Sequence, residues 1–396
     1  MPCRGEEQKS QKSKDLKSIM AKKNVLLITN LKEDGQYSML RFGEMLKRNI
    51  SKDHFNLDEL FPIPKFQKLL KSSKTKKWGG YLDKYYLFPK KIKRFFNQEH
   101  DSLSLVHIID HSNSVYLSNL ANFSKPKIIT CHDLIAIRTA QDHCHQAPVT
   151  PFTGKRLQNW ITKSLPFADF FACDSSETKK DLNQIIPSSI GRSKVIHLGV
   201  ENQNQNFNNK NITLPFNPIT TSYLLHVGSA AWYKNRGAVI QAFKNFCEQN
   251  SGPLTKLVLV GPNIQDSEVS PKILEWLRKN KNKVTTINHA SEQELHFLYK
   301  NANVFLFPSF IEGFGWPPLE ASSNGCPVIT TRTGAISDIL GESAVYIDPN
   351  NQKQINQALL DSLKIKNKKA FHQSIPTSEE CAFNYAELYD KLIHNS

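Results

Sequence analysis

Short apolar runs alternate with helical patterns along most of the chain, and this alternation limits the possible folds more than any other feature. Residues 24–29 form a β-rich run, and apolar residues recur at helical spacing through residues 39–46. Strands that alternate with helices are typical of parallel sheets covered by helices on both faces. The sequence therefore predicts an α/β fold with doubly wound parallel sheets.

The pattern is interrupted once, at residues 201–211, and then starts again. This stretch is almost wholly Asn and Gln, so it has little apolar surface to bury and favours an exposed linker. A chain of 396 residues is also too long for one ordinary core. The expected parts are a disordered basic tail (1–22), a first Rossmann-like domain on the acceptor side (23–200), a linker (201–215), a second Rossmann-like donor domain (216–376) and a C-terminal helix (377–396).

One loop indicates the chemistry. From Glu312 to Glu320 the chain reads E-G-F-G-W-P-P-L-E. Gly313 and Gly315 let the backbone come close to a ligand, and the two prolines suit a first helical turn. A free helix N-terminus favours a phosphate, and carboxylates accept hydrogen bonds from hydroxyl groups. Phosphate and polyol together indicate a sugar nucleotide, although the loop could also be an ordinary tight turn.

With the runs on either side, this loop resembles the donor-binding segment of retaining glycosyltransferases of family 4, whose two glutamates it carries eight positions apart. The resemblance implies the GT-B fold, in which two facing Rossmann-like domains enclose an interdomain cleft and the last helix returns to the first domain. It also implies that Glu320 grips the ribose hydroxyls and Glu312 the sugar hydroxyls, with backbone N–H groups of Phe314 and Gly315 nearby. Because this family is thought to use front-face substitution, Glu312 is expected to position the sugar rather than act as a nucleophile.

A cationic contact is expected just after the predicted strand 223–227. An ammonium group at Lys234 can stabilise a leaving diphosphate, although a lone lysine is more often a surface residue. The resemblance also implies a basic residue shortly before the Lys-Asn pair, but this chain has Ser229 and Tyr233 there. Arg236 is a candidate substitute for that missing cation.

In the first half, His132 ends a predicted strand within C-H-D-L, which resembles the family's H-D-L segment near the reacting sugar. We expect its neutral imidazole to bond the sugar or to orient the acceptor, and a buried structural histidine is the alternative. The predicted catalytic residues are His132, Glu312 and Lys234. The predicted donor-binding residues are Gly35, Gly228, Lys234, Glu312, Gly313, Phe314, Gly315, Leu319 and Glu320.

The net charge of +15 comes almost wholly from residues 1–200, where 33 basic residues face 19 acidic ones. Residues 65–96 mix Lys and Arg with Trp, Tyr and Phe. Such a segment suits peripheral contact with an anionic membrane or an acidic acceptor. Alternatively, it is a solvated basic face whose aromatic side chains pack inward. Nucleic-acid binding is the least favoured interpretation, since no motif supports it.

Several motifs of other chemistries are missing. The sequence has no D-x-D, G-x-G-x-x-G or Walker A pattern, so neither a metal nor a cofactor is expected. Its seven scattered cysteines favour reduced thiols and a cytoplasmic location. The sequence thus predicts a cytoplasmic, metal-independent, retaining glycosyltransferase that moves a hexose, with mannose as a candidate, from a nucleotide sugar to a saccharide or lipid-linked acceptor. A free-sugar synthase of the sucrose-phosphate or glycogen synthase type and a catalytically silent sugar-nucleotide binder remain open.

Overall fold

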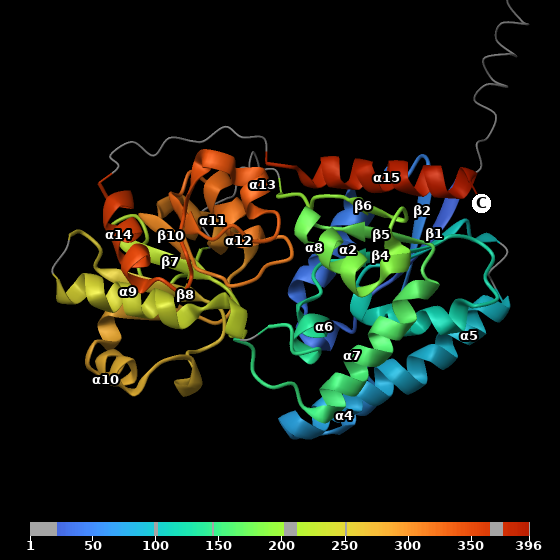
Figure 1. The fold of residues 1–396 in the computed structure, drawn as a ribbon, viewed down its shortest axis with the longest axis horizontal. Coiled ribbons are helices and arrows are strands. Elements are labelled where there is room, and N and C mark those ends of the chain that lie inside the picture. Colours follow the sequence, from blue (N-terminus) through green and yellow to red (C-terminus); the bar gives the residue numbers. More distant parts are fainter. Residues whose placement is uncertain are drawn as a thin grey trace, which may run out of the picture.

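A computed structural model describes residues 22–98, 102–144, 146–201, 212–249, 252–364 and 375–395. The chain forms two six-stranded sheets, one in the first half of the sequence and one in the second, each flanked by helices (Figure 1). Every strand pair is parallel. The predicted doubly wound α/β fold is therefore confirmed. The expected tail and most of the expected linker lie outside the described residues.

The first sheet has the strand order β2-β1-β3-β4-β5-β6. Its strands are β1 (Lys23–Ile28), β2 (Phe55–Leu60), β3 (Leu105–Ile108), β4 (Lys127–Cys131), β5 (Phe170–Cys173) and β6 (Ser193–Val195). Strand β2 was not predicted from the sequence, and its polar sequence F-N-L-D-E-L suits its place at the sheet edge. Its helices are α2 (Tyr37–Asn49), α3 (Phe66–Leu69), α4 (Ser73–Leu82), α5 (Phe88–Gln98), α6 (Ile135–Ala140), α7 (Phe152–Ser164) and α8 (Ser176–Ile185).

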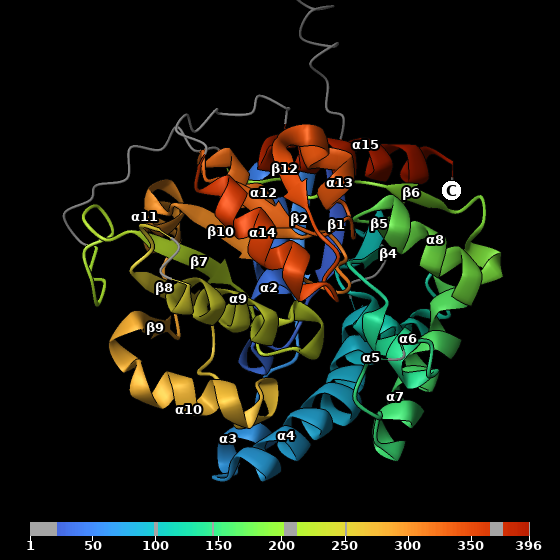
Figure 2. The same cartoon turned by 60° about the vertical axis from the view of Figure 1, so that its left-hand side comes forward.

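The second sheet has the strand order β12-β11-β10-β7-β8-β9. Its strands are β7 (Tyr223–Val227), β8 (Lys256–Val260), β9 (Val284–Ile287), β10 (Val304–Phe307), β11 (Val328–Thr330) and β12 (Ala344–Tyr346). The accompanying helices are α9 (Arg236–Glu248), α10 (Pro271–Lys279), α11 (Glu292–Asn301), α12 (Trp316–Ser323), α13 (Ile336–Leu340) and α14 (Gln352–Ser362). Figure 2 brings α9 and α10 of this half to the front.

Local sequence signals explain where several of these helices begin and end. Ser291 and Glu294 form a reciprocal capping box at the start of α11, and their spacing in S-E-Q-E is typical of such a cap. Helix α12 begins directly after Gly315 and ends two residues before Gly325, which has a φ of +74°. The helix thus begins where the sequence predicts, and the loop before it lies at the carboxyl end of β10.

The C-terminal helix α15 (Ser378–His394) belongs with the first sheet, over which it lies in Figures 1 and 2. Buried hydrogen bonds fix it there. His107 Nδ1 on β3 lies 2.7 Å from Tyr389 Oη, and Thr130 Oγ1 on β4 lies 2.9 Å from Tyr385 Oη. The chain therefore passes between its halves twice, once before the second sheet in the sequence and once after it.

The two crossing segments touch each other. Val200 and Thr377 form a parallel bridge. A Cβ atom on Gly199 would lie 2.2 Å from the Thr377 backbone, so only glycine allows this approach. The two connections between the halves therefore run side by side at this point.

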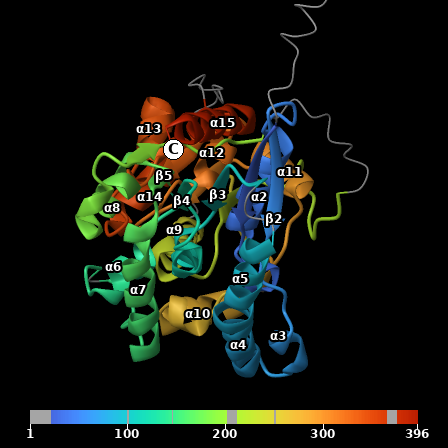
Figure 3. The same ribbon diagram turned by 90° about the vertical axis from the view of Figure 1, so that its right-hand side faces the viewer.

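The basic, aromatic segment expected to contact a partner forms α3, α4, a π-helical turn (Asp83–Leu87) and most of α5. With α7 these elements project away from the first sheet (Figure 3). Phe88 and Phe96 are buried, but Trp78 and Tyr86 are 60% and 54% exposed. Its aromatic side chains are thus divided between the core and the surface. None of the described helices combines the length and the apolar character that crossing a membrane requires.

Candidate functional site

The carboxyl ends of the two sheets meet at Gly313. This residue follows β10, and a Cβ atom built on it would lie 1.8 Å from the carbonyl oxygen of His132, which follows β4. No side chain fits in that space, so glycine is required for the contact. The predicted loop of the second half thereby lies directly against the predicted H-D-L segment of the first half. Ligands of open parallel sheets bind at such strand ends.

Glu312 and Lys234, both predicted from the sequence, form an ion pair at this edge. Lys234 Nζ donates to both carboxylate oxygens of Glu312, at 2.8 and 2.9 Å. The Glu312 side chain is only 7% exposed and that of Lys234 14%. Asn235 follows Lys234 and fixes the backbone there, because its side-chain amide donates to the carbonyls of Pro308 and Pro349. The structure thus brings the two predicted polar residues into one nearly buried pair.

Glu320, on α12, is held from two sides. Its Oε1 atom accepts a hydrogen bond from Arg41 on α2, and its Oε2 atom accepts one from Tyr299 Oη at 3.1 Å. The Arg41 guanidinium also lies over the Trp316 ring, 4.8 Å from its centroid. Burial lowers the pKa of Arg41, but the charge and hydrogen bond of Glu320 outweigh burial and raise it. Arg41 was not predicted as a site residue from the sequence.

The start of α12 has the features of an anion site. Gly315 precedes the helix with a φ of +92°, and no side chain caps the first turn. That conformation favours glycine, and the first N–H groups of a helix lack intrahelical partners. Phe314 and Leu319 are buried in the core. Any contact that these two make with a ligand would therefore come from the backbone.

The remaining predicted glycines lie at strand ends. Gly228 follows β7. A Cβ atom built on Gly261 would lie only 2.1 Å from the carbonyl oxygen of Gly228. Gly35 has a φ of +70° and open space around it. Gly228 thus belongs to a tight backbone crossing, whereas Gly35 is at an open loop of the first half.

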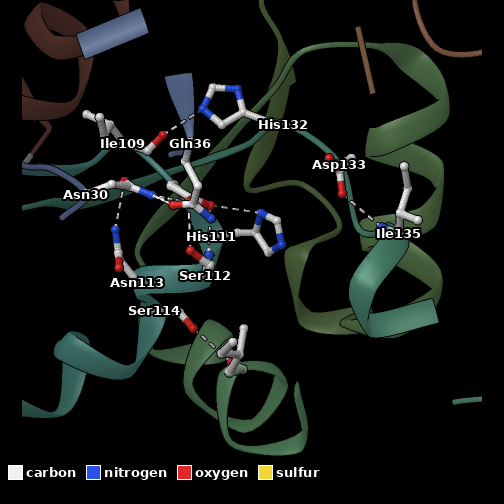
Figure 4. A network of polar contacts seen from close by, with 12 residues as sticks. Asn30, Gln36, Ile109, His111, Ser112, Asn113, Ser114, His132, Asp133 and Ile135 are labelled. Atoms are coloured by element: carbon white, nitrogen blue, oxygen red, sulfur yellow. Dashed lines mark hydrogen bonds and ion pairs between the residues drawn. The ribbon is translucent and has the colours of Figure 1, made fainter. Parts of the chain in front are cut away.

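His132 differs from the neutral, sugar-facing imidazole expected from the sequence. Its Nδ1 atom lies 2.6 Å from Asp174 Oδ2. Its Nε2 atom lies 2.8 Å from the carbonyl oxygen of Ile109, a contact drawn in Figure 4. Both partners are acceptors, so both ring nitrogens donate and the ring is a buried imidazolium. Burial lowers the pKa of His132, but Asp174 outweighs it and the pKa is raised to about 9. Neither ring nitrogen remains for a sugar.

Arg236 does not take the place of the missing cation. Its guanidinium is bidentate to Glu268, at 2.7 and 2.6 Å, and also donates to the Pro262 carbonyl. The side chain is 1% exposed. Arg236 therefore ties the start of α9 to a neighbouring loop.

A buried polar network at the ends of β1 and β3 also escaped the sequence analysis. Asn30 Nδ2 donates to Asp110 Oδ2 at 2.6 Å and to Gln36, and Asn113 Nδ2 donates to Asn30 Oδ1 at 3.0 Å (Figure 4). Burial raises the pKa of Asp110, but His111, His132 and the Ser112 hydrogen bonds outweigh burial and lower it. The signal in the sequence was a polar residue soon after each of two buried strands.

Solved structures show that the whole fold is a known one. The sucrose-phosphate synthase of Thermosynechococcus elongatus matches 95% of this chain and 100% of its own, with a TM-score of 0.71 and 18% identity. The structure of Anabaena HepE in complex with UDP and glucose matches 94% of this chain and 98% of its own, with a TM-score of 0.60 and 14% identity. At these identities the likeness concerns the fold alone, which is the GT-B fold.

Sequence relatives match a shorter part. The O-antigen chain mannosyltransferase B of Escherichia coli is 28% identical over 148 residues, which are 36% of this chain and 37% of the relative. The capsular polysaccharide biosynthesis glycosyltransferase CapM of Staphylococcus aureus is 33% identical over 136 residues, 34% of each chain. The chain thus matches little more than a third of the length of these relatives. Residues 215–374 of this chain match the model of the family Glycosyl transferases group 1.

Proposed function

We propose that this protein is a retaining glycosyltransferase that moves a hexose from a nucleoside diphosphate sugar to a saccharide or a lipid-linked acceptor. The observation that carries this proposal is the Lys234–Glu312 pair beside the free start of α12. An ammonium group, backbone N–H groups and a carboxylate are together the groups that a diphosphate with an attached polyol needs. In this proposal residues 216–376 hold the donor, and residues 23–200 receive the acceptor.

The proposed residues divide the donor between them. Lys234 and the first N–H groups of α12 face the diphosphate, Glu320 bonds the ribose and Glu312 bonds the sugar hydroxyls. The bond between C1 of the sugar and the phosphate oxygen breaks, and the acceptor oxygen bonds C1 on the same face. The acceptor proton passes to the departing diphosphate, whose growing negative charge Lys234 stabilises. This reaction takes its positive charge from the protein and needs no metal.

His132 is proposed as a positioning residue. Its ring charge is matched by Asp174, while its own carbonyl oxygen meets Gly313. A fixed His132 backbone therefore determines the position of the Gly313 loop. This role replaces the direct sugar contact expected from the sequence.

Mannose is the first sugar to test, because two of the sequence relatives are O-antigen chain mannosyltransferases, from Escherichia coli and Salmonella typhimurium. Polysaccharide biosynthesis is the corresponding setting. A second candidate, transfer to a free sugar phosphate, is favoured by 43% identity over 63 residues to the sucrose-phosphate synthase of Spinacia oleracea. Those 63 residues are only 6% of that relative.

Peripheral contact with an anionic membrane on the cytoplasmic side is also proposed, through the outer surface of α4, α5 and α7. On α7, Phe152 is 70% and Trp160 43% exposed, in addition to Trp78 and Tyr86. The Arg156 guanidinium lies 4.5 Å from the Phe152 ring centroid, and Lys90 Nζ lies 3.8 Å from that of Tyr86. Aromatic rings accompanied by cations suit the headgroup region of such a bilayer.

The test is a screen of purified protein with nucleotide sugars. GDP-mannose, UDP-glucose and UDP-galactose are each offered with a membrane extract or with fructose 6-phosphate, and the anomeric configuration of any product is read by NMR. Transfer with retention that Lys234→Ala reduces by about 100-fold or more supports the proposal. Inversion, or full activity in the variant, contradicts it. Product formed only with fructose 6-phosphate favours the second candidate.

A further inference from the structure

Arg41 extends from the first half of the chain into the proposed donor site. It lies on α2, yet its partners Glu320 and Trp316 both lie on α12 of the second half. Glu320 is proposed to bond the ribose, and Trp316 is the first residue of the helix proposed to face the diphosphate. Arg41 is thus next to both parts of the proposed nucleotide site.

The Arg41 guanidinium is held in one plane and has donors to spare. The Trp316 ring lies beneath it, and this ring is fixed in turn because Trp316 Nε1 donates to the Gly199 carbonyl at 3.0 Å. A guanidinium carries five N–H donors, and Glu320 accepts from one of its nitrogens. In the described parts of the chain, the other N–H groups of Arg41 have no acceptor. A planar fork with free donors suits bidentate binding of a phosphate.

The second half lacks a further cation where one is expected. Ser229 and Tyr233 occupy the positions at which the resemblance implies a basic residue. Arg236 is bound to Glu268, and the charge of Lys234 is shared with Glu312. A donor diphosphate carries more negative charge than one shared ammonium group balances.

We infer that Arg41 is the second cationic contact of the donor diphosphate, supplied by the half of the chain opposite to the rest of the donor site. The inference rests on the proposed function, because it assumes a nucleoside diphosphate at α12. It makes Arg41 a residue that selects for the charge of the nucleotide. It also couples donor binding to the approach of the two halves.

A latch that merely joins the halves through Glu320 is the competing interpretation, and it makes a different prediction. If Arg41 only occupies Glu320, its removal frees this carboxylate for the ribose. A nucleoside and its diphosphate would then gain or lose affinity equally. If Arg41 contacts phosphate, its removal weakens the diphosphate far more than the nucleoside.

The test compares guanosine with GDP, and uridine with UDP, by isothermal titration of the full chain. The variants are Arg41→Ala, Arg41→Lys and Arg138→Ala. Arg138 pairs with Asp181 within the first half, and the side-chain exposures of that pair, 26% and 16%, match the 28% and 12% of Arg41 and Glu320. Arg138→Ala therefore controls for the loss of one half-buried ion pair. Thermal unfolding of each variant confirms that it is folded.

We expect Arg41→Ala to weaken diphosphate binding by about 10- to 100-fold and nucleoside binding by less than about threefold. Arg41→Lys keeps the charge but not the planar fork, so we expect an intermediate loss. An equal change for nucleoside and diphosphate, or none, overturns the inference.

Lys234→Ala separates this outcome from failure of the proposed function. If the wild-type chain binds diphosphate and only Lys234→Ala weakens this binding, the proposed role of Arg41 is excluded and the proposed function is not. If the wild-type chain binds no diphosphate, the proposed function fails as well.

Discussion

Lys234 Nζ lies within 2.9 Å of both carboxylate oxygens of Glu312, so the two side chains proposed to hold the donor also hold each other. Nearly buried pairs of this kind are sensitive to the loss of one partner, because the remaining charge is left uncompensated. The pair therefore has a structural consequence that can be measured separately from its part in transfer.

Glu312→Gln should abolish most transfer and destabilise the protein less than Glu312→Ala does. Glutamine keeps the shape and one acceptor for Lys234, but alanine leaves the ammonium group unpaired, at a cost of about 1–3 kcal/mol. Urea unfolding of both variants and of Lys234→Ala/Glu312→Ala measures this difference. If the double variant loses as much free energy of unfolding as the two single variants together, or more, the coupling is contradicted.

Gly313→Ala should push the two halves apart where the Gly313 loop lies against His132. The added Cβ atom would lie 1.8 Å from the His132 carbonyl oxygen, so one of the loops must move. We expect transfer to fall by at least about 100-fold, since misplacement by an ångström can cost that much. Gly80→Ala is the control, because its Cβ atom has no neighbour nearer than 3.5 Å. Equal activity of the two variants would show that the contact is not needed.

Stability should fall as the pH rises through the upper titration of His132. Its pKa is raised from 6.5 to about 9, so the folded protein binds this proton more tightly than the unfolded chain does. The resulting stabilisation is complete below about pH 6.5 and is lost as the pH rises to about 9. Urea midpoints between pH 6 and 9.5 measure the slope. Asp174→Asn removes the anion that raises this pKa, and an unchanged slope in that variant would disprove the assignment.

Trp78→Ala combined with Trp160→Ala should weaken binding to anionic vesicles. Both rings are substantially exposed on α4 and α7. Cosedimentation with phosphatidylglycerol vesicles should fall several-fold in the double variant, and all binding should decrease with added salt. Phe383→Ala removes an exposed ring on α15 and serves as the control. Equal binding to phosphatidylcholine vesicles would argue against an electrostatic contact.

The sequence predicted the parts of the fold whose signals are local. The capping box at Ser291, strand β10 and the loop from Glu312 to Glu320 follow one another within a few dozen consecutive residues. Strand β2 was missed because its edge position permits a polar sequence without apolar alternation. Periodicity alone does not distinguish such a strand from a loop.

The site was predictable only as far as its contacts are near in sequence or belong to a known motif. Arg41 and Glu320 are 279 positions apart, and nothing in either segment indicates the other. The charge state of His132 depends on Asp174, which is 42 residues further along. A buried histidine takes its proton count from its partners, so the sequence around His132 could not decide it.

The side-by-side crossings at Gly199 and Thr377 constrain how the halves can move. Because the two connecting segments are held together at one place, a rotation of the halves about that place strains the connections less than a slide of one half past the other. Any opening that admits a large acceptor should therefore be greatest at the edge farthest from that place. The opening between the two halves is then described by one angle. A cross-link between residues 199 and 377 would leave this rotation free.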